Sequence, residues 1–431
     1  MPRWVLTLVF LCLAPWASLS AQTDDLDKLN PLSSNPGGLR LQNVTGFFGY
    51  YSAGFSGYGS SVVSPGGATQ AGGSATLGYS WLAERSGVSV TYTPTFVRSF
   101  QNSGFSTSTH NLSINWHRSA TPRLSYGLTL SGYLTSLSEA LVGTASVPDG
   151  QNNTPGSPLS QGTSLTTLFY GSRYVTSALT GTVSYAASAR STWQAGFSAN
   201  LTEGLPYGSA VNQYQPEYLL NRTTSGQANL GYSRSLSPYT QVGISASSIR
   251  TFSRIYDSLA TTGDVSITHA VGMRWSLQAH GGAGFVDPLR QNNFGYSGYR
   301  GAQYQTGGSI AYKTRVHAFQ VQVDRAISDQ YGFGARATLS AVGTWNWARP
   351  GRSWWWTSTF GEQYLSQSAL GNINTWQATA GIGRRVGPRV STFLQYGFGT
   401  YSGVAAGPQR QLTQHTVRLS FVLTPSGMAR F

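Results

Sequence analysis

Residues 337–364 read ATLSAVGTWNWARPGRSWWWTSTFGEQY, and this stretch decides the fold class. Its first arm alternates, with Leu339 and Trp345 among the apolar residues of one face and polar residues on the other, a period of two that is typical of a β-strand. A polar turn over 348–353 then leads directly into the Trp run 354–356. Because Trp rings gather at the headgroup level of a membrane, so many Trp around one basic turn predict a hairpin that crosses a bilayer.

The composition narrows the class of protein. The formal net charge is +14, yet only 10% of the residues are charged, 13% are aromatic and Gly numbers 52. Cys12 is the single Cys and lies in the apolar N-terminal run, so the mature chain is expected to lack thiols. No later stretch approaches the roughly 20 apolar residues of a membrane helix, which leaves strands as the means of crossing.

The chain divides into three predicted parts. Residues 1–21 have the features of a secretory signal, with Arg3, an apolar run and small residues before Ala21, and cleavage after Ser20 is the alternative. Residues 22–43 are polar and are interpreted as a periplasmic lead-in. Residues 44–431 are predicted to form the transmembrane domain.

Beyond Val44, strand-like runs alternate with two kinds of connection. One kind is short and often basic, and the other is usually longer and richer in Tyr, Asn and Gly, a pattern typical of the periplasmic turns and extracellular loops of membrane barrels. Eight short turns, an opening strand near 44–55 and a closing strand near 416–423 predict eighteen strands, with sixteen as the alternative. The short turns are expected at 84–87, 119–123, 188–191, 235–238, 272–274, 313–315, 348–353 and 385–389.

Trp concentrates near these short turns, whereas Tyr favours the other ends of the strands. This distribution, with alternating apolar and polar faces along strand after strand, predicts an all-β fold: a single transmembrane antiparallel β-barrel whose apolar face meets lipid. The Trp residues expected to form a periplasmic girdle are Trp81, Trp116, Trp193, Trp275, Trp345, Trp347, Trp354 and Trp356.

The architecture resembles that of bacterial outer-membrane β-barrels, and among them the porin-like barrels. The resemblance covers nearly all of the mature chain and rests on architecture, not on a specific motif. Many such barrels end in Phe, as this chain does at Phe431, although 425–427 interrupt the alternation. General porins narrow the pore with their third outer loop, so the resemblance implies a constriction loop at about 136–175, with Glu139 and Asp149 as its acidic members. A plain surface loop is the alternative.

Strand parity also predicts which charged and aromatic side chains enter the lumen. Asp324 and Arg336 are equidistant from Gln330, so they are expected to face each other as an ion pair. Most of the remaining lining is Ser, Thr, Gln, Asn and Gly, which suits neutral polar solutes and makes no strong ion filter. The predicted pore-lining candidates are Asp324, Arg336, Arg418, His117 and His280, and the inward rings are Trp355, Phe393 and Tyr133, for which packing is the favoured role.

Catalysis is not indicated. None of the six His lies in a GxSxG or HExxH context, and the strand interiors lack carboxylate clusters. The chain is therefore predicted not to be an enzyme and to need no cofactor or metal.

The predicted function is passive diffusion of small polar solutes through a water-filled barrel in the bacterial outer membrane, with a weak preference for anions. The alternatives are an export or assembly barrel, for example for exopolysaccharide, and a surface-binding, adhesin-like barrel. Expected partners are outer-membrane lipid and lipopolysaccharide, the solutes, the barrel-assembly machinery and, by resemblance, further copies in a homotrimer. The Arg residues are scattered around the strand ends, so nucleic acid is not an expected partner.

Overall fold

A computed structural model of the chain describes residues 38–57, 67–101, 106–136, 173–205, 222–253, 256–291, 300–328, 336–349, 351–368, 371–402 and 410–424. The predicted signal peptide, most of the lead-in, Glu139, Asp149 and Phe431 lie outside the described residues. Among those that are described, no helix is long and apolar enough to cross a membrane.

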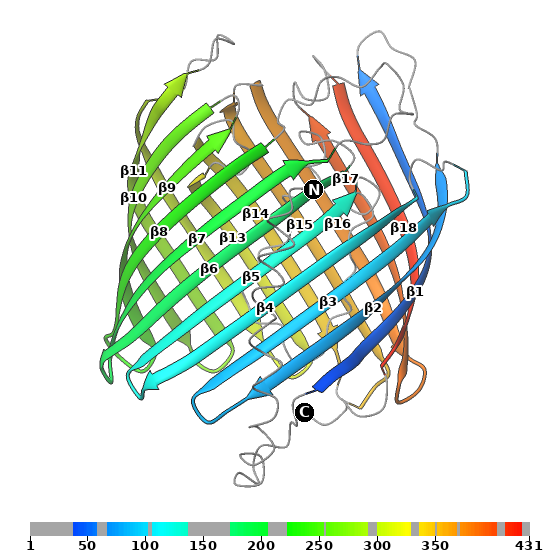
Figure 1. The fold of residues 1–431 in the computed structure, drawn as a ribbon, viewed down its shortest axis with the longest axis horizontal. Helices are drawn as coiled ribbons and strands as arrows, with labels where there is room; N and C mark the ends of the chain where they lie inside the picture. The colour runs from blue at the N-terminus through cyan, green and yellow to red at the C-terminus, as the bar shows by residue number, and fades with distance from the viewer. Residues whose placement is uncertain are drawn as a thin grey trace, which may run out of the picture.

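The described residues form eighteen strands in one closed sheet (Figure 1). The strands are β1 Gly38–Gly57, β2 Ala68–Leu82, β3 Ser86–Ser99, β4 Thr107–Thr121, β5 Leu124–Ser136, β6 Arg173–Ser188, β7 Ser191–Gly204, β8 Arg222–Ser235, β9 Thr240–Ser253, β10 Tyr256–Val271, β11 Trp275–Gln291, β12 Gly301–Lys313, β13 His317–Ser328, β14 Arg336–Ala348, β15 Trp354–Ser368, β16 Gly371–Arg385, β17 Val390–Ser402 and β18 Arg410–Leu423.

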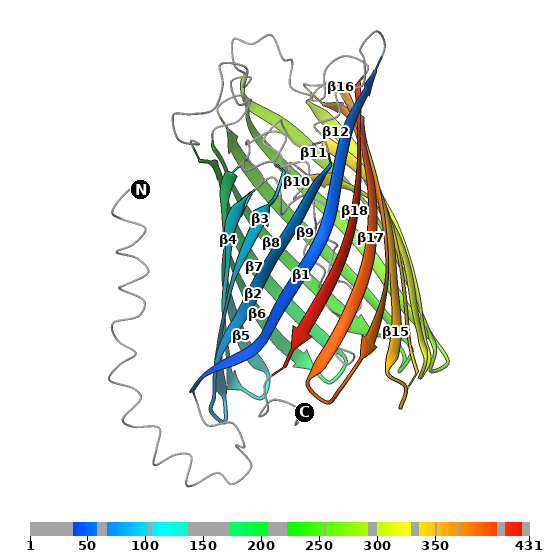
Figure 2. The same cartoon turned by 90° about the vertical axis from the view of Figure 1, so that its right-hand side faces the viewer.

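The sheet closes because the first and last strands pair. Each strand pairs antiparallel with the next along the chain, and β1 also pairs with β18, from Val44 opposite Leu423 to Gly57 opposite Arg410. Figure 2 shows these two strands side by side. The prediction of an eighteen-stranded antiparallel barrel is confirmed, and the sixteen-strand alternative is wrong. The first strand begins at Gly38, so the end of the predicted lead-in already belongs to the wall.

The eight short connections fall where the sequence predicts them, and all lie at one end of the barrel. We call this end the turn end and the opposite end the loop end. Two turns contain a left-handed residue, Gly272 with φ 64° and Gly351 with φ 77°. Glycine adopts this backbone conformation without the steric penalty of a Cβ atom, which explains its place in both turns.

The two faces of the wall differ in chemistry. Along β18, alternate residues are large and apolar and 37–49% exposed, whereas the residues between them are buried. Side chains crowd on the concave side of a closed single-layered sheet, so the buried face points into the lumen and the exposed apolar face points outward. On β18 the outward set is Val417, Leu419, Phe421 and Leu423, and the inward set is Thr416, Arg418, Ser420 and Val422.

Candidate functional site: the lumen wall and its rims

In the turn half of the barrel, the inward face is covered on one side and open on the other. On β17 and β18, the inward side chains of Phe393 and Ser420 are only 1–2% exposed. In the turn half and middle of β7, β9, β11 and β13, inward side chains are exposed instead, and they include Gln194, Ser245, Gln278 and Gln322. In the loop half of these strands the inward side chains of Thr251 and Val286 are buried as well, as is that of Gln70 on β2. In the turn half, a solute in the lumen therefore meets mainly the wall formed by these later strands.

Two partly exposed carboxylates lie on the inward face of the later strands, one on β10 and one on β13. Asp264 on β10 accepts a hydrogen bond from Nε2 of Gln305 on β12, and it reaches that partner across Gly282 of the intervening strand. A Cβ atom on Gly282 would collide with the Asp264 side chain and with the backbone of β10, so glycine is what lets this carboxylate lie flat across the neighbouring strand.

The second carboxylate repeats this arrangement one row away. Asp324 on β13 places Oδ1 3.6 Å from Nε2 of His280 on β11, and the register places Gly307 of β12 between them. Gln322 also donates a hydrogen bond to Asp324. We call Asp264, His280, Gln305, Gln322 and Asp324 the polar wall patch.

The predicted ion pair between Asp324 and Arg336 is wrong. The register places Ser340 opposite Asp324 and Ser328 opposite Arg336. The prediction assumed a hairpin centred on Gln330, whereas the pairing of β13 with β14 is centred two residues later. Such a shift by an even number of pairs keeps each residue on its face but changes its partner. The Arg336 side chain lies outside the described part of the chain.

Arg418 lies on the covered wall. Its guanidinium carbon is 3.8 Å from the ring centroid of Phe47 on β1, a cation–π contact, and Arg418 itself is only 9% exposed. Phe47 was not identified from the sequence because its contact with Arg418 depends on the pairing of the first strand with the last.

An aromatic row runs along the same covered wall. The rings of Trp355 and Phe393 stack with centroids 6.4 Å apart and planes 6° apart, and both lie flat against glycines of β16. Ser420 follows in the same cross-strand row and is flanked by Phe393 on one side and Phe47 on the other. Because Phe393 and Phe47 are nearly inaccessible, this row packs the wall and offers a solute little surface.

The six His divide between the two faces. His117 lies inward on β4, over Gly87, and His280 belongs to the polar wall patch. The other four share the outward face with apolar residues, and three of them contact aromatic rings, as His317 does by stacking on Trp345. No group of three or more His, Asp or Glu within the described ranges is arranged to hold a metal ion.

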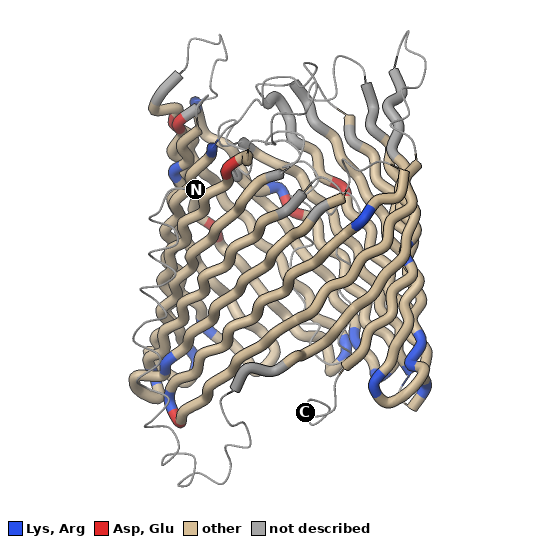
Figure 3. Tube along the Cα trace, turned by 45° about the vertical axis from the view of Figure 1, so that its right-hand side comes forward, with Lys and Arg blue, Asp and Glu red and all other residues tan. Residues whose placement is uncertain are grey.

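The turn end carries a basic rim. Every short turn contains or directly adjoins at least one exposed Arg or Lys, and Glu84 is the only carboxylate among the described residues there (Figure 3). The ion pairs between described residues involve Arg250, His280 and Arg300, none of which belongs to this rim. The basic rim consists of Arg85, Arg118, Arg123, Arg190, Arg234, Arg274, Lys313, Arg315, Arg349, Arg352, Arg384, Arg385 and Arg389.

The loop half of the wall is more balanced in charge. Arg250 pairs with Asp257 at 3.2 Å, and Arg300 pairs with Asp287 at 3.2 Å. Arg325 instead lies over the ring of Tyr304, with its guanidinium carbon 3.7 Å from the centroid. Apart from Glu84, the described carboxylates lie in this half or, as Asp264 does, at the middle of the wall.

The predicted girdle residues are placed near the turn end. Their side chains have outward parity, and Trp193, Trp275, Trp345 and Trp354 are 41–45% exposed. Two of them pair with Tyr on the next strand, Trp193 with Tyr232 and Trp275 with Tyr312, with ring centroids 4.8 and 4.5 Å apart. Trp355 is the inward exception in the 354–356 run.

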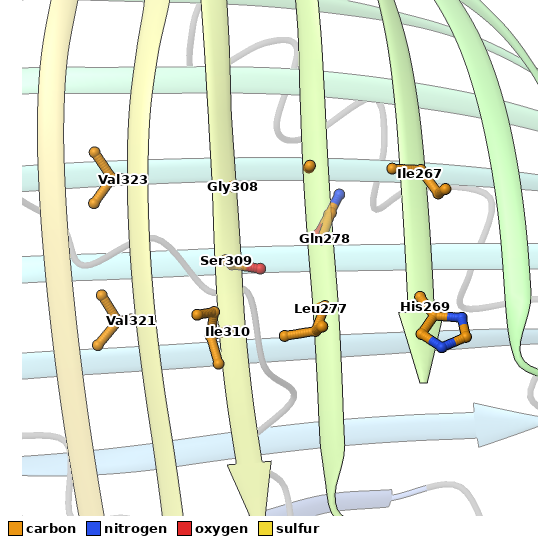
Figure 4. A pocket seen from close by; sticks show the side chains of 10 residues that line it. Ile267, His269, Leu277, Gln278, Gly308, Ser309, Ile310, Val321 and Val323 are labelled. Carbon is orange, nitrogen blue, oxygen red and sulfur yellow. The ribbon is translucent and has the colours of Figure 1, made fainter. Parts of the chain in front are cut away.

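The outward face also carries a shallow hollow of about 360 Å³. Figure 4 shows its side chains on four neighbouring strands, β10 to β13. Gly308 lies at the bottom of this hollow, and the side chains of Ile267, Leu277, Ile310 and Val321 form its sides. The hollow is apolar and belongs to the outer surface, so it adds nothing to the lumen.

The chain resembles known proteins in its fold alone. No protein-family model matches the chain, and no curated protein matches it. Among solved structures, the chain is similar to Pseudomonas aeruginosa OccK9 (OpdG), with 11% identity over 89% of this chain and 98% of that one and a TM-score of 0.46. It is also similar to P. aeruginosa OccK2 (OpdF) in complex with glucuronate, at 9% identity, the same coverages and a TM-score of 0.45.

A third similar structure is P. aeruginosa OpdQ, at 10% identity over 89% of this chain and 97% of that one, with a TM-score of 0.42. At these identities the likeness concerns the fold alone. The eighteen paired strands themselves show a closed antiparallel β-barrel.

Proposed function

We propose that the chain forms a pore in the bacterial outer membrane through which small polar solutes diffuse passively, with a weak preference for anions. The observation that carries this proposal is the closed eighteen-stranded wall with an apolar outward face and an inward face made mainly of hydroxyl, amide and glycine residues. Barrels of 16–18 strands are wide enough to leave an aqueous channel. On this proposal, the N-terminal signal directs the chain to the envelope and is removed.

The lining supports diffusion without a strong ion filter. Among the described residues, the charged groups inside the wall are sparse: Asp264, Asp324 and Arg418 lie well within it. Hydroxyl and amide groups exchange hydrogen bonds with water and with neutral solutes, whereas strong ion selectivity requires rings of charge at a constriction. The proposed pore-lining residues are His117 and the partly or fully exposed members of the polar wall patch: Asp264, His280, Gln322 and Asp324.

The anion preference is proposed from the basic rim. Exposed cations surround the mouth of the barrel at the turn end. A mouth lined by charges of one sign raises the local concentration of ions of the opposite sign, here anions. Because these charges are exposed to water, their effect is screened at physiological ionic strength over a distance of about 8 Å. The preference should therefore be modest and should fade as salt rises.

Single-channel recording of the refolded chain in a planar bilayer, with a salt gradient across it, tests both parts. Steady open steps with a reversal potential on the anion side support the proposal. A properly inserted barrel that never conducts would contradict the proposal of an open pore. Open steps with a cation-side reversal potential would retain the pore and reject the anion preference.

A further inference from the structure

Three cations of the basic rim point outward and follow the same local pattern. On β4, Arg118 lies two residues closer to the turn than Trp116, on the same outward face. On β8, Arg234 lies two residues closer to the turn than Tyr232, whose ring contacts Trp193. A spacing of two along a strand keeps both side chains on one face and separates their Cα atoms by about 7 Å.

The third case forms a direct contact. Arg384 on β16 is paired with Trp354 on β15, and its guanidinium carbon is 5.0 Å from the ring centroid of Trp354. All three Arg side chains are exposed. At three places around the barrel, an outward aromatic ring is thus accompanied by a guanidinium group at the rim.

The loop half does not repeat this excess of cations. There, outward Arg250 and Arg300 already have carboxylate partners at 3.2 Å. The three turn-end cations belong to a rim in which Glu84 is the only described carboxylate. A concentration of like charge at one rim is unfavourable unless anions from outside the chain meet it.

We propose that Arg118, Arg234 and Arg384 bind the phosphate groups of anionic phospholipids in the membrane leaflet at the turn end. Trp and Tyr rings sit at the headgroup level, so an Arg displaced from them toward the turn lies at the depth of the phosphates. Guanidinium groups bind phosphate with two parallel hydrogen bonds, and basic residues at a membrane surface attract anionic lipid. This contact would hold the barrel at a set depth.

The test uses the full chain, refolded in detergent micelles that contain equal amounts of phosphatidylglycerol and phosphatidylcholine. Native mass spectrometry then measures the ratio of the two lipids that remain bound. The variant R118Q/R234Q/R384Q removes three outward cations at the turn end. The control R98Q/R222Q/R325Q removes three from outward positions in the loop half, so both variants lose the same charge.

The wild-type chain should retain phosphatidylglycerol in preference to phosphatidylcholine. Each basic residue near a surface contributes on the order of a fivefold preference for anionic lipid, so three contribute at most about a hundredfold before screening. Screening reduces this, and the turn-end variant should lower the bound ratio by about tenfold. The control should lower it by less than about twofold. The conservative variant R118K/R234K/R384K keeps the charge and should retain most of the preference.

Two results would overturn the proposal. One is a wild-type chain that binds both lipids equally. In that case the positive charge of the basic rim would be neutralised by an acidic soluble partner or by bulk ions instead of lipid. The other is an equal loss in the turn-end and control variants, both shown by electrophoretic mobility to be folded. Neither result depends on conduction, so the pore can fail while lipid binding stands, and the reverse also holds.

Discussion

Nε2 of His280 lies 3.6 Å from Oδ1 of Asp324, and the two side chains meet above Gly307 of the strand between theirs. This contact depends on position 307 being glycine, which has no side chain. A Cβ atom at Gly307 would collide with Asp324 and would lie 2.8 Å from both Nε2 of His280 and the carbonyl oxygen of Val323. The substitution Gly307→Ala should therefore destabilise the barrel by about 1–3 kcal/mol, the usual cost of overpacking. Urea unfolding in lipid vesicles measures this free energy.

The matched control is Gly281→Ala. Gly281 lies on adjacent β11, one residue from His280, and a Cβ atom there would meet nothing within 4 Å. Its substitution should change the free energy of unfolding by less than about 0.5 kcal/mol or stabilise the strand slightly. Equal losses at Gly281 and Gly307 would mean that the collision with the carboxylate is not the cause.

The carboxylates of the polar wall patch should oppose the effect of the basic rim on ion selectivity. Asp264 and Asp324 point into the lumen and are partly exposed. The variant D264N/D324N removes both charges but keeps groups of similar size, so the anion-to-cation permeability ratio should rise, by about two- to fivefold for charges at a wall. Reversal potentials in a salt gradient measure this ratio.

Asp257→Asn is the control for that experiment. Asp257 points outward and pairs with Arg250 at 3.2 Å, so its charge lies outside the lumen. Its loss should leave the reversal potential nearly unchanged. An unchanged permeability ratio in D264N/D324N, with conductance intact, would show that ions do not pass close to the polar wall patch.

The register explains which parts of the site could be predicted from the sequence. A period of two assigns each residue to a face, so Asp324, His280 and Arg418 could be placed inward before any pairing was known. Their partners depend on register: Asp324 lies opposite Ser340 because the pairing is centred beyond Gln330, and no residue in the sequence marks that centre.

Contacts across more than one strand require the whole sheet. Asp264 reaches Gln305 only because Gly282 of β11 lies between them, which combines two separate registers. Phe47 meets Arg418 only because the first strand closes on the last. Alternation along a single strand predicts neither of these two contacts. If the register were known, an inward carboxylate placed opposite a glycine would be a recognisable signal of such a contact.

The assignment of faces itself can be tested on β7. Phe197 points outward and is 50% exposed, whereas Ser198, the next residue, points inward. An Arg on the lipid face costs about 2–4 kcal/mol near the middle of the bilayer, and an Arg in a wet lumen costs little. Phe197→Arg should thus destabilise the barrel by that amount in urea unfolding, and Ser198→Arg by less than about 1 kcal/mol. The reverse order would mean that the two faces are exchanged.

The stacked rings of Trp355 and Phe393 offer a test of the covered wall. With planes 6° apart and centroids 6.4 Å apart, they should be energetically coupled by about 0.5–1.5 kcal/mol beyond the area that each buries. A double-mutant cycle of W355L, F393L and the pair, followed by urea unfolding, isolates this term. The pair of Phe393 with Trp193, a ring on the outward face of a distant strand, is the control and should give additive losses. Additivity between Trp355 and Phe393 as well would show that each ring packs independently against its glycine, so that the row stabilises the wall without any contribution from stacking.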